Sequence, residues 1–243
     1  MHTRLIPVPG TFNIRDLGGY ATPEGHTRWR SILRADGLHR MTAEGVAELH
    51  ALGVRTVIDL RRGHELEAGP NPFRDHAAVD YRHIPLFDEL DLVEVARQGP
   101  NVLLTLYRRA LAERQAAIRD VLVAIAEAPE GVVLFHCTAG KDRTGIIAAL
   151  LLAHVGVARA DIVADYAATK AQIAPLRDDL VKRVAARGDD VAAFLTLLEC
   201  EPETMEAWLD HLAEQHRDVA GYLAGIGLDA AVLARLRARL VAG

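Results

Sequence analysis

One short stretch holds the residues best suited to catalysis: His-Cys-Thr-Ala-Gly-Lys-Asp-Arg-Thr-Gly at positions 136–145. It follows the apolar run Gly-Val-Val-Leu-Phe at 131–135, which is typical of a strand covered on both faces. Cys137 comes directly after this predicted strand, and Arg143 precedes a predicted helix that Thr144 and Gly145 begin. A loop between a strand and a helix N-terminus directs successive backbone N–H groups inward, and together with the helix dipole it binds anions.

The chemistry that this arrangement predicts is nucleophilic attack on phosphorus. An anion held in the loop lies over the sulfur of Cys137, and the same positive potential favours the reactive thiolate. Arg143 grips two phosphoryl oxygens through its planar guanidinium. The attack forms a cysteinyl-phosphate that water then hydrolyses, and the chemistry requires no metal or organic cofactor. The residues expected to hold the phosphate are Thr138, Ala139, Gly140, Lys141, Asp142 and Arg143.

The loop matches the signature of cysteine-dependent protein tyrosine phosphatases. With Lys141 and Asp142 beside Arg143, it resembles more narrowly the atypical bacterial protein tyrosine/serine phosphatase family. Segments 12–19, 57–62 and 220–228 agree with this resemblance, which covers essentially the whole chain. The resemblance implies an α/β fold with a central, largely parallel sheet flanked by helices. It also implies activity on phosphotyrosine, with phosphoserine, phosphothreonine or phosphoinositides as substrates of some members.

An acid must protonate the leaving oxygen and a base must then activate water, and one carboxyl can do both. Asp88, Glu89 and Asp91 follow a predicted strand, so their segment starts at the same sheet edge as the cysteine loop. In the family that the chain resembles, the acid follows a strand and a short turn that contains proline, and Asp88 matches this pattern. We predict Asp88 as the acid, with Glu89 and Asp91 as alternatives. A solvated acidic loop or a helix N-cap is the simpler interpretation.

Four further residues of the loop have supporting roles in this interpretation. Lys141 contacts a second anionic group of the substrate or is an exposed charge, and Asp142 positions water, fixes the loop or caps the following helix. His136 orders the loop by hydrogen bonding, because the thiolate needs no base. Thr144 donates its hydroxyl to the sulfur and helps the sulfur to leave.

Polar residues outside the loop form two more candidate groups. The resemblance suggests that Asn13, Arg15 and Asp16 brace the site from behind; the alternative is a turn with its own Arg15–Asp16 network. Arg61 follows a predicted strand and binds substrate or pairs with a carboxylate such as Glu65.

Three residues elsewhere are expected to be structural. We interpret Tyr107 and Tyr166 as packing or surface residues and Cys200 as a core residue. The histidines show no metal-ligand spacing, so we predict no metal site.

Alternating strands and helices must position the loop. Strand-like runs at 29–33, 55–60, 81–85 and 131–135 alternate with helical patterns at 42–52 and 102–128, which predicts a mostly parallel sheet with its site at the carboxyl edge. From residue 145 onward helical spacing dominates. We expect one phosphatase domain over 1–243, in which 156–243 is a mostly helical elaboration that packs on the sheet, closes as a lid or contacts a partner.

Composition excludes several other classes of protein. The chain has 243 residues, 50% of them hydrophobic and 25% charged, which is typical of a soluble globular protein and excludes disorder. A net charge of −5 argues against nucleic-acid binding. The apolar runs are too short to span a bilayer, and Pro7 and Pro9 interrupt any signal-peptide segment, so the sequence predicts a cytoplasmic protein.

Three alternatives to a protein phosphatase stay open on the sequence alone. The same loop serves phosphoinositides or other small phosphate esters, with Lys141 favouring them. Arsenate reduction or sulfur transfer also uses a thiol in an anion cradle, but reductases usually need further nearby cysteines. A phosphate-binding module without turnover is the third. The expected partner is therefore a phosphorylated protein, a phospholipid or a small phosphate ester.

Overall fold

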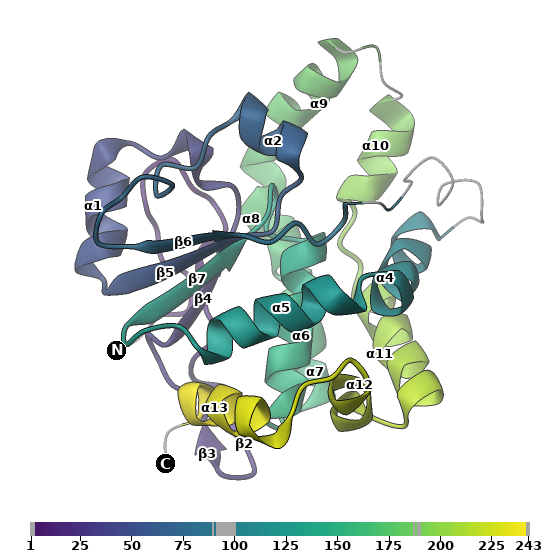
Figure 1. The fold of residues 1–243 in the computed structure, drawn as a ribbon. Helices are drawn as coiled ribbons and strands as arrows, with labels where there is room; N and C mark the ends of the chain where they lie inside the picture. The colour runs from purple at the N-terminus through teal and green to yellow at the C-terminus, as the bar shows by residue number, and fades with distance from the viewer. Residues whose placement is uncertain (1–2, 89, 91–100, 187, 189–190, 242–243) are drawn as a thin grey trace.

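A five-stranded sheet forms the centre of the computed structural model, which describes residues 3–88, 90, 101–186, 188 and 191–241 (Figure 1). The strand order is β1-β4-β7-β5-β6, in which β4, β7, β5 and β6 are parallel and β1 pairs antiparallel with β4 at one edge. The strands of this sheet are β1 (Arg15–Asp16), β4 (Ile32–Ala35), β5 (Val54–Asp59), β6 (Asp80–His83) and β7 (Val132–His136). The predicted largely parallel sheet is confirmed. A separate hairpin pairs β2 (Ala21–Thr22) with β3 (Gly25–His26).

The central strand β7 delivers the cysteine loop to the middle of the carboxyl edge. All five of its residues are buried. Its last residue, His136, pairs with Ala35 at the end of β4 and with Asp59 at the end of β5. Cys137 therefore leaves the sheet between the segments that follow two neighbouring strands, and side chains on both segments can reach the loop.

Successive side chains of a strand point to opposite faces, and β7 shows how this divides the core into two. Val133 and Phe135 belong to the larger hydrophobic cluster, and Val132 and Leu134 to the smaller one. The smaller cluster lies under α1 (Ala43–Ala51), whose Leu49 is fully buried. The larger cluster is covered by the helices that follow β6 and β7.

These helices cover one face of the sheet and extend beyond its carboxyl edge (Figure 1). They are α4 (Val102–Glu113), α5 (Gln115–Ala126), α6 (Asp142–His154), α7 (Arg159–Ala167), α8 (Thr169–Ile173), α9 (Arg177–Ala186), α10 (Val191–Leu198), α11 (Pro202–His216), α12 (Val219–Gly225) and α13 (Ala230–Leu240). A short helix, α2 (Gly63–Ala68), follows β5, and 3₁₀ turns occupy Leu38–Arg40 and Ala174–Leu176. None of the described helices combines the length and apolar character needed to cross a bilayer.

One predicted helix is wrong in its extent. The helical pattern over 102–128 forms two helices, because Arg114 leaves the helical backbone conformation at φ −114° and ψ 26°. Its guanidinium Nε donates to the carbonyl of Leu86, 3.1 Å away, in the segment after β6. The break lets α4 turn toward the carboxyl edge of the sheet, where Leu103 and Leu106 line a cavity.

Candidate active site

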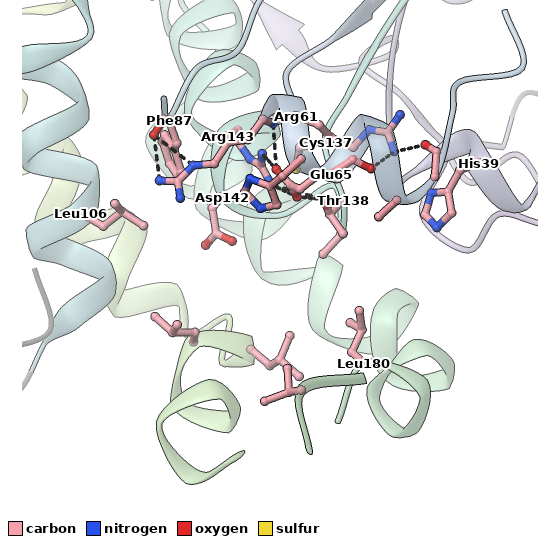
Figure 2. Close-up of a pocket in the computed structure, with 18 of the residues that line it drawn as sticks. His39, Arg61, Glu65, Phe87, Leu106, Cys137, Thr138, Asp142, Arg143 and Leu180 are labelled. Atoms are coloured by element: carbon pink, nitrogen blue, oxygen red, sulfur yellow. Dashed lines mark hydrogen bonds and ion pairs between the residues drawn. The ribbon is translucent and has the colours of Figure 1, made fainter. Parts of the chain in front are cut away.

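Residues 137–143 are hereafter called the Cys137 loop. Most of them line a cavity of about 390 Å³ (Figure 2): Cys137, Thr138, Ala139, Asp142 and Arg143. Cys137 is a free cysteine that is 2% exposed. The cavity is lined by loop residues, by polar residues that follow β5, and by apolar side chains of α4, α9 and α10. Its polar part comes mainly from the loop and the segment after β5, and its apolar part comes mainly from the helices.

Backbone carbonyls of the loop are held from behind, on the side away from the cavity. The amide N–H of Gly37 donates to the carbonyl of Thr138, at 3.0 Å. The side-chain amide of Asn13 donates to the carbonyls of Ala139 and Gly140, at 3.1 and 3.3 Å. The predicted bracing by Asn13 is thus a direct contact with the loop.

A buried arginine completes this set of contacts. Arg34, the third residue of β4, is fully buried, and its Nη2 donates to the carbonyl of Gly140 at 2.7 Å. Because a trans peptide is planar, its N–H points opposite to its C=O. The amides of Ala139, Gly140 and Lys141 therefore point toward the cavity, which is the arrangement that binds an anion.

The loop passes close to β4 at Gly140. This residue has a φ of +65°, which favours glycine, and a side chain there would put its Cβ 2.6 Å from the carbonyl oxygen of Ala35. Glycine is required here for both its conformation and its size.

Arg143 is positioned by a carboxylate. Its Nη1 and Nη2 donate to the two oxygens of Glu65 on α2, at 2.5 and 3.0 Å, and its Nη1 donates to the carbonyl of Leu60 at 3.3 Å. The hydroxyl of Thr138 donates to the same carboxylate. Burial alone would lower the pKa of Arg143, but the sulfur of Cys137 and the carboxylate of Glu65 hold that pKa above its ordinary value.

The same contacts keep Glu65 ionised. Burial alone would raise its pKa, but the hydrogen bonds and charge of Arg143, with the hydroxyl of Thr138, lower the pKa of Glu65 to about 2. The sequence predicted that Arg61 binds substrate or pairs with a carboxylate such as Glu65, and Arg61 does pair with a carboxylate, but not with that of Glu65. Arg61 is buried and its guanidinium instead contacts Asp59, with Nη2 and Oδ2 at 2.7 Å.

His136 lies within a buried polar group behind Cys137. Its Nδ1 is 3.1 Å from the carbonyl of Cys137, so the hydrogen bond to the loop that the sequence predicted is present. Its Nε2 lies 2.8 Å from Nδ2 of Asn71 and 3.3 Å from Oδ2 of Asp59. Burial raises the pKa of Asp59, but the charges of His136 and Arg61 and the hydrogen bonds from them bring it well below its ordinary value.

Lys141 differs from both roles predicted for it. It is fully buried, neither an exposed charge nor a residue of the cavity lining. Its Nζ donates to the carbonyls of Leu197 and Glu199 at the end of α10, the second at 2.7 Å, and lies 3.1 Å from Oδ1 of Asp142. A cation at a helix C-terminus is favoured by the helix dipole, so Lys141 ties the loop to α10.

Among the residues that the structure describes, Asp142 shares the cavity lining with one other carboxyl, that of Glu65. Its Oδ1 accepts a hydrogen bond of 2.6 Å from the hydroxyl of Tyr107 on α4, which lies 2.9 Å from the hydroxyl of Tyr166. Both tyrosines are buried, and burial raises their pKa well above the ordinary value, as does the charge of Asp142. The packing role predicted for Tyr107 omitted this contact with the loop.

Asp88 follows β6 as predicted, but it is not among the residues that line the cavity. Its neighbour Phe87 lines the cavity, and Phe87 lies under the guanidinium of Arg143 at 5.7 Å from ring centroid to Cζ. The alternatives Glu89 and Asp91 lie outside the described residues. The role of Asp88 stays a prediction.

Two supporting contacts predicted from the sequence are absent from the described part of the chain. The hydroxyl of Thr144 is buried and has no hydrogen-bond partner there, so it does not donate to the sulfur of Cys137. Asp16 does not reach the loop, since its carboxylate accepts from the amides of Gly18 and Arg30, both at 2.9 Å. The Arg15–Asp16 network is also absent, and Arg15 instead contacts Asn13 and Asp165.

The remaining wall of the cavity is apolar. It is lined by Leu180 and Val184 of α9 and by Leu197 and Leu198 of α10. Leu106 of α4 contributes from another side than Leu180 (Figure 2). The helical second half therefore does more than complete the core, because two of its helices form part of the cavity wall.

Comparison with known proteins identifies the family of the chain. A model of the tyrosine phosphatase family matches residues 6–242, and the chain belongs to that family.

Three curated relatives are similar to it. A tyrosine-protein phosphatase of Nostoc commune is 40% identical over 139 residues, which span 56% of this chain but only 47% of that protein. The triple specificity protein phosphatase PtpB of Mycobacterium tuberculosis is 27% identical over 96% of this chain and 98% of its own length. A putative tyrosine-protein phosphatase of Cupriavidus necator is 29% identical over 95% of this chain and 86% of that protein.

Gly140→Ala tests the close approach of the loop to β4. The strained φ and the contact with Ala35 together should cost about 2 to 5 kcal/mol of unfolding free energy, and anion binding by the loop should fall. Gly227→Ala is the matched control, because its φ is +86° but its added Cβ would meet nothing closer than Arg119 Cδ at 3.9 Å. Urea unfolding and phosphate titration measure both variants. Unchanged stability and phosphate affinity in Gly140→Ala would contradict the described loop.

Glu65→Gln tests the ion pair with Arg143 through its pH dependence. Because the folded-state pKa of Glu65 is about 2, below the ordinary 4.5, the pair stabilises the fold fully above about pH 5. This stabilisation, of the order of 3 kcal/mol, is lost as pH falls from 5 toward 2. The difference in unfolding free energy between wild type and Glu65→Gln should therefore shrink between pH 6 and pH 3.

The control for this experiment is Glu113→Gln, which removes an exposed pair with Arg109 on α4. Exposed pairs contribute less than about 1 kcal/mol, so this variant should show little change at any pH. A Glu65→Gln difference that stays constant from pH 6 to pH 3 would show that Glu65 is not held ionised by Arg143.

Proposed function

We propose that this chain hydrolyses phosphate monoesters by nucleophilic catalysis through Cys137, with phosphotyrosine as the preferred substrate. The observation that carries the proposal is the position of the Cys137 sulfur at the floor of a cavity, beside amides that face inward and a guanidinium fixed by Glu65. Membership of the tyrosine phosphatase family supports it.

The proposed reaction has two displacement steps. In the first, the thiolate of Cys137 attacks phosphorus, an S–P bond forms, and the P–O bond to the leaving group breaks as that oxygen takes a proton. In the second, water attacks phosphorus, gives up a proton, and displaces the sulfur as phosphate forms. The amides of the loop and Arg143 stabilise the charge on the equatorial oxygens in both transition states, where fixed donors are most effective.

For the acid of the first step we propose Asp142 in place of Asp88. The acid must lie within reach of the leaving oxygen, and Asp142 lines the cavity whereas Asp88 does not. Glu65 also lines the cavity, but its two oxygens are already bonded to Arg143 and Thr138. The hydroxyl of Tyr107 fixes the orientation of Asp142.

The apolar wall of the cavity supports an aromatic phosphate ester. Phe87, Leu103 and Leu106 line one part of the cavity, with the leucines of α9 and α10 in another. Contact with an aromatic ring removes apolar surface from water, and each Å² buried stabilises the complex by about 25 cal/mol. The short side chain of phosphoserine buries less apolar surface and gains less.

The phosphoinositide alternative receives less support than it did from the sequence. It relied on Lys141 as a contact for a second anionic group, and Lys141 is instead bonded to α10. The relative from Mycobacterium tuberculosis is named a triple specificity phosphatase, so a range of phosphate esters belongs in the first assays.

Cysteine-based reduction is also less well supported. Cys200, the other cysteine of the chain, is buried, and its Sγ donates to the carbonyl of Tyr166 at 3.1 Å. Burial raises the pKa of the Cys200 thiol to about 11, so it is a poor nucleophile for resolving a bond to Cys137.

Cys137→Ser tests the proposed nucleophile. Wild type should release phosphate from an aryl phosphate in the presence of EDTA, and the variant should lose at least about 1,000-fold in kcat because the hydroxyl is a far weaker nucleophile. Acid quenching of wild type during turnover should trap a phosphate adduct on the peptide that contains Cys137, detected by mass spectrometry. Folded, reduced wild type that releases no phosphate from any ester tested would contradict the proposal.

Asp142→Asn and Asp88→Asn together test the assignment of the acid. A leaving group that is stable as an anion needs little protonation, whereas tyrosine needs an acid. Asp142→Asn should therefore lose about 100-fold in kcat with phosphotyrosine but much less with p-nitrophenyl phosphate. Asp88→Asn should keep the wild-type kcat with both phosphotyrosine and p-nitrophenyl phosphate. The opposite result would return the acid role to Asp88.

A further inference from the structure

A buried carboxylate that does not line the cavity lies behind the Cys137 loop. Asp165 is on α7, and its side chain is 2% exposed. Its Oδ2 is paired with Nη1 of Arg34, and its Oδ1 accepts a hydrogen bond of 3.0 Å from the hydroxyl of Tyr20. Arg15 contacts the same residue, with Nη2 2.6 Å from the backbone carbonyl and 3.5 Å from Oδ1.

Two chains of contacts lead from this carboxylate to the loop. In the first, Arg34 bridges Asp165 and the loop, since its Nη1 is paired with the carboxylate and its Nη2 donates to the carbonyl of Gly140. The guanidinium is planar and rigid, so the position of one nitrogen sets the position of the other.

In the second chain of contacts, Arg15 donates to the side-chain oxygen of Asn13. The amide nitrogen of Asn13 then donates to the carbonyls of Ala139 and Gly140. This contact fixes the orientation of the Asn13 side-chain amide. Its oxygen faces the guanidinium of Arg15, and its nitrogen therefore faces the loop.

The electrostatic balance of this group depends on the one carboxylate. Arg15 and Arg34 are both buried, and burial together with the charge of Arg34 lowers the pKa of Arg15 to about 10. Burial raises the pKa of Asp165, but the two arginines hold it below its ordinary value. Among the described residues, Asp165 is the carboxylate that pairs with Arg15 and Arg34. Its loss would leave these two buried cations without that counterion, and such groups separate, admit water or lose a proton.

We propose that Asp165 is a positioning residue for phosphoryl transfer: through Arg34, and through Arg15 and Asn13, it sets the orientation of the peptide groups whose amides face the phosphate. The proposal rests on the function proposed above. Asp165 touches neither the substrate cavity nor the reacting atoms, and it acts on the transition state by way of the loop backbone. Loss of Asp165 should therefore affect kcat and the binding of a transition-state analogue more than KM, because fixed amides act most strongly on the charge of the transition state.

Three variants and one control test the proposal. Asp165→Asn keeps the shape of the side chain and removes its charge. Arg34→Lys keeps the buried charge balance, but it replaces the rigid fork, whose two nitrogens hold Asp165 and Gly140 separately, with one freely rotating ammonium on a flexible chain. The double variant shows whether the two residues act as one unit. Tyr20→Phe is the control, since it removes a hydrogen bond to Oδ1 of the same carboxylate and keeps both the charge of Asp165 and its pairing with Arg34 through Oδ2.

The measurements are kcat and KM for an aryl phosphate, the affinity for orthovanadate by calorimetry, and the unfolding free energy. Asp165→Asn and Arg34→Lys should each lose about 10- to 100-fold in kcat, lose vanadate affinity to a similar degree, and change KM by less than about threefold. The kcat of the double variant should be no lower than the kcat of the less active single variant. Tyr20→Phe should lose stability but keep kcat and vanadate affinity.

Several results would overturn the proposal. One is a folded Asp165→Asn or Arg34→Lys protein with wild-type kcat and vanadate affinity. Another is an equal loss in Tyr20→Phe, which would indicate a general effect of stability. A third is losses that multiply in the double variant, because Asp165 would then act independently of Arg34. If Asp165→Asn does not fold, Arg34→Lys and the control decide alone.

Failure of the proposed function gives a different result. Wild type would then release no phosphate. The vanadate affinities of wild type and of the four variants would still report on the geometry of the loop. A loss of affinity confined to the variants of Asp165 and Arg34 would support the positioning role without the reaction.

Discussion

Three consecutive backbone carbonyls behind Cys137 must point away from the cavity if the amides beside them are to face it. A loop of seven residues cannot enforce this alone, because each peptide plane can rotate. The amide of Gly37, the side chain of Asn13 and the guanidinium of Arg34 each hold one or two of these carbonyls. The anion site is therefore built by the N-terminal segment and β4 as much as by the loop that carries the nucleophile.

The buried guanidinium groups around the loop are also held in fixed directions by their partners. Arg143 is paired with Glu65, Arg34 with Asp165 and Arg61 with Asp59, so each guanidinium is held by a carboxylate in a fixed direction. Replacing a whole buried pair of this kind with apolar side chains costs little net stability, because desolvation offsets the attraction, whereas removing one partner alone leaves a buried charge and is costly. The effect of these pairs is to fix direction: a paired guanidinium has few orientations, and a site that must stabilise a transition state benefits from donors that are already in place.

The sequence predicted the parallel sheet and the strand–loop–helix unit, because these follow from local patterns and a motif. The resemblance suggested that Asn13 braces the site, and the structure gives its contacts with the loop. The sequence missed Arg34 and Asp165, which are far apart in the chain and meet only in the folded structure. The run predicted as a strand ended at residue 33, one residue before Arg34, so the prediction did not place this arginine inside the sheet. Lys141 was misjudged as well, because its partners belong to α10, more than fifty residues later.

The most direct measurement is a crystal structure of the wild-type protein with orthovanadate bound. Vanadium should lie next to the sulfur of Cys137. Its equatorial oxygens should lie within hydrogen-bond distance of the amides of Ala139, Gly140 and Lys141 and of the Arg143 guanidinium. The carbonyls of Thr138, Ala139 and Gly140 would keep their contacts with Gly37, Asn13 and Arg34. Vanadate bound away from Cys137, or a loop in which any of these three carbonyls turns to face the anion, would contradict this arrangement.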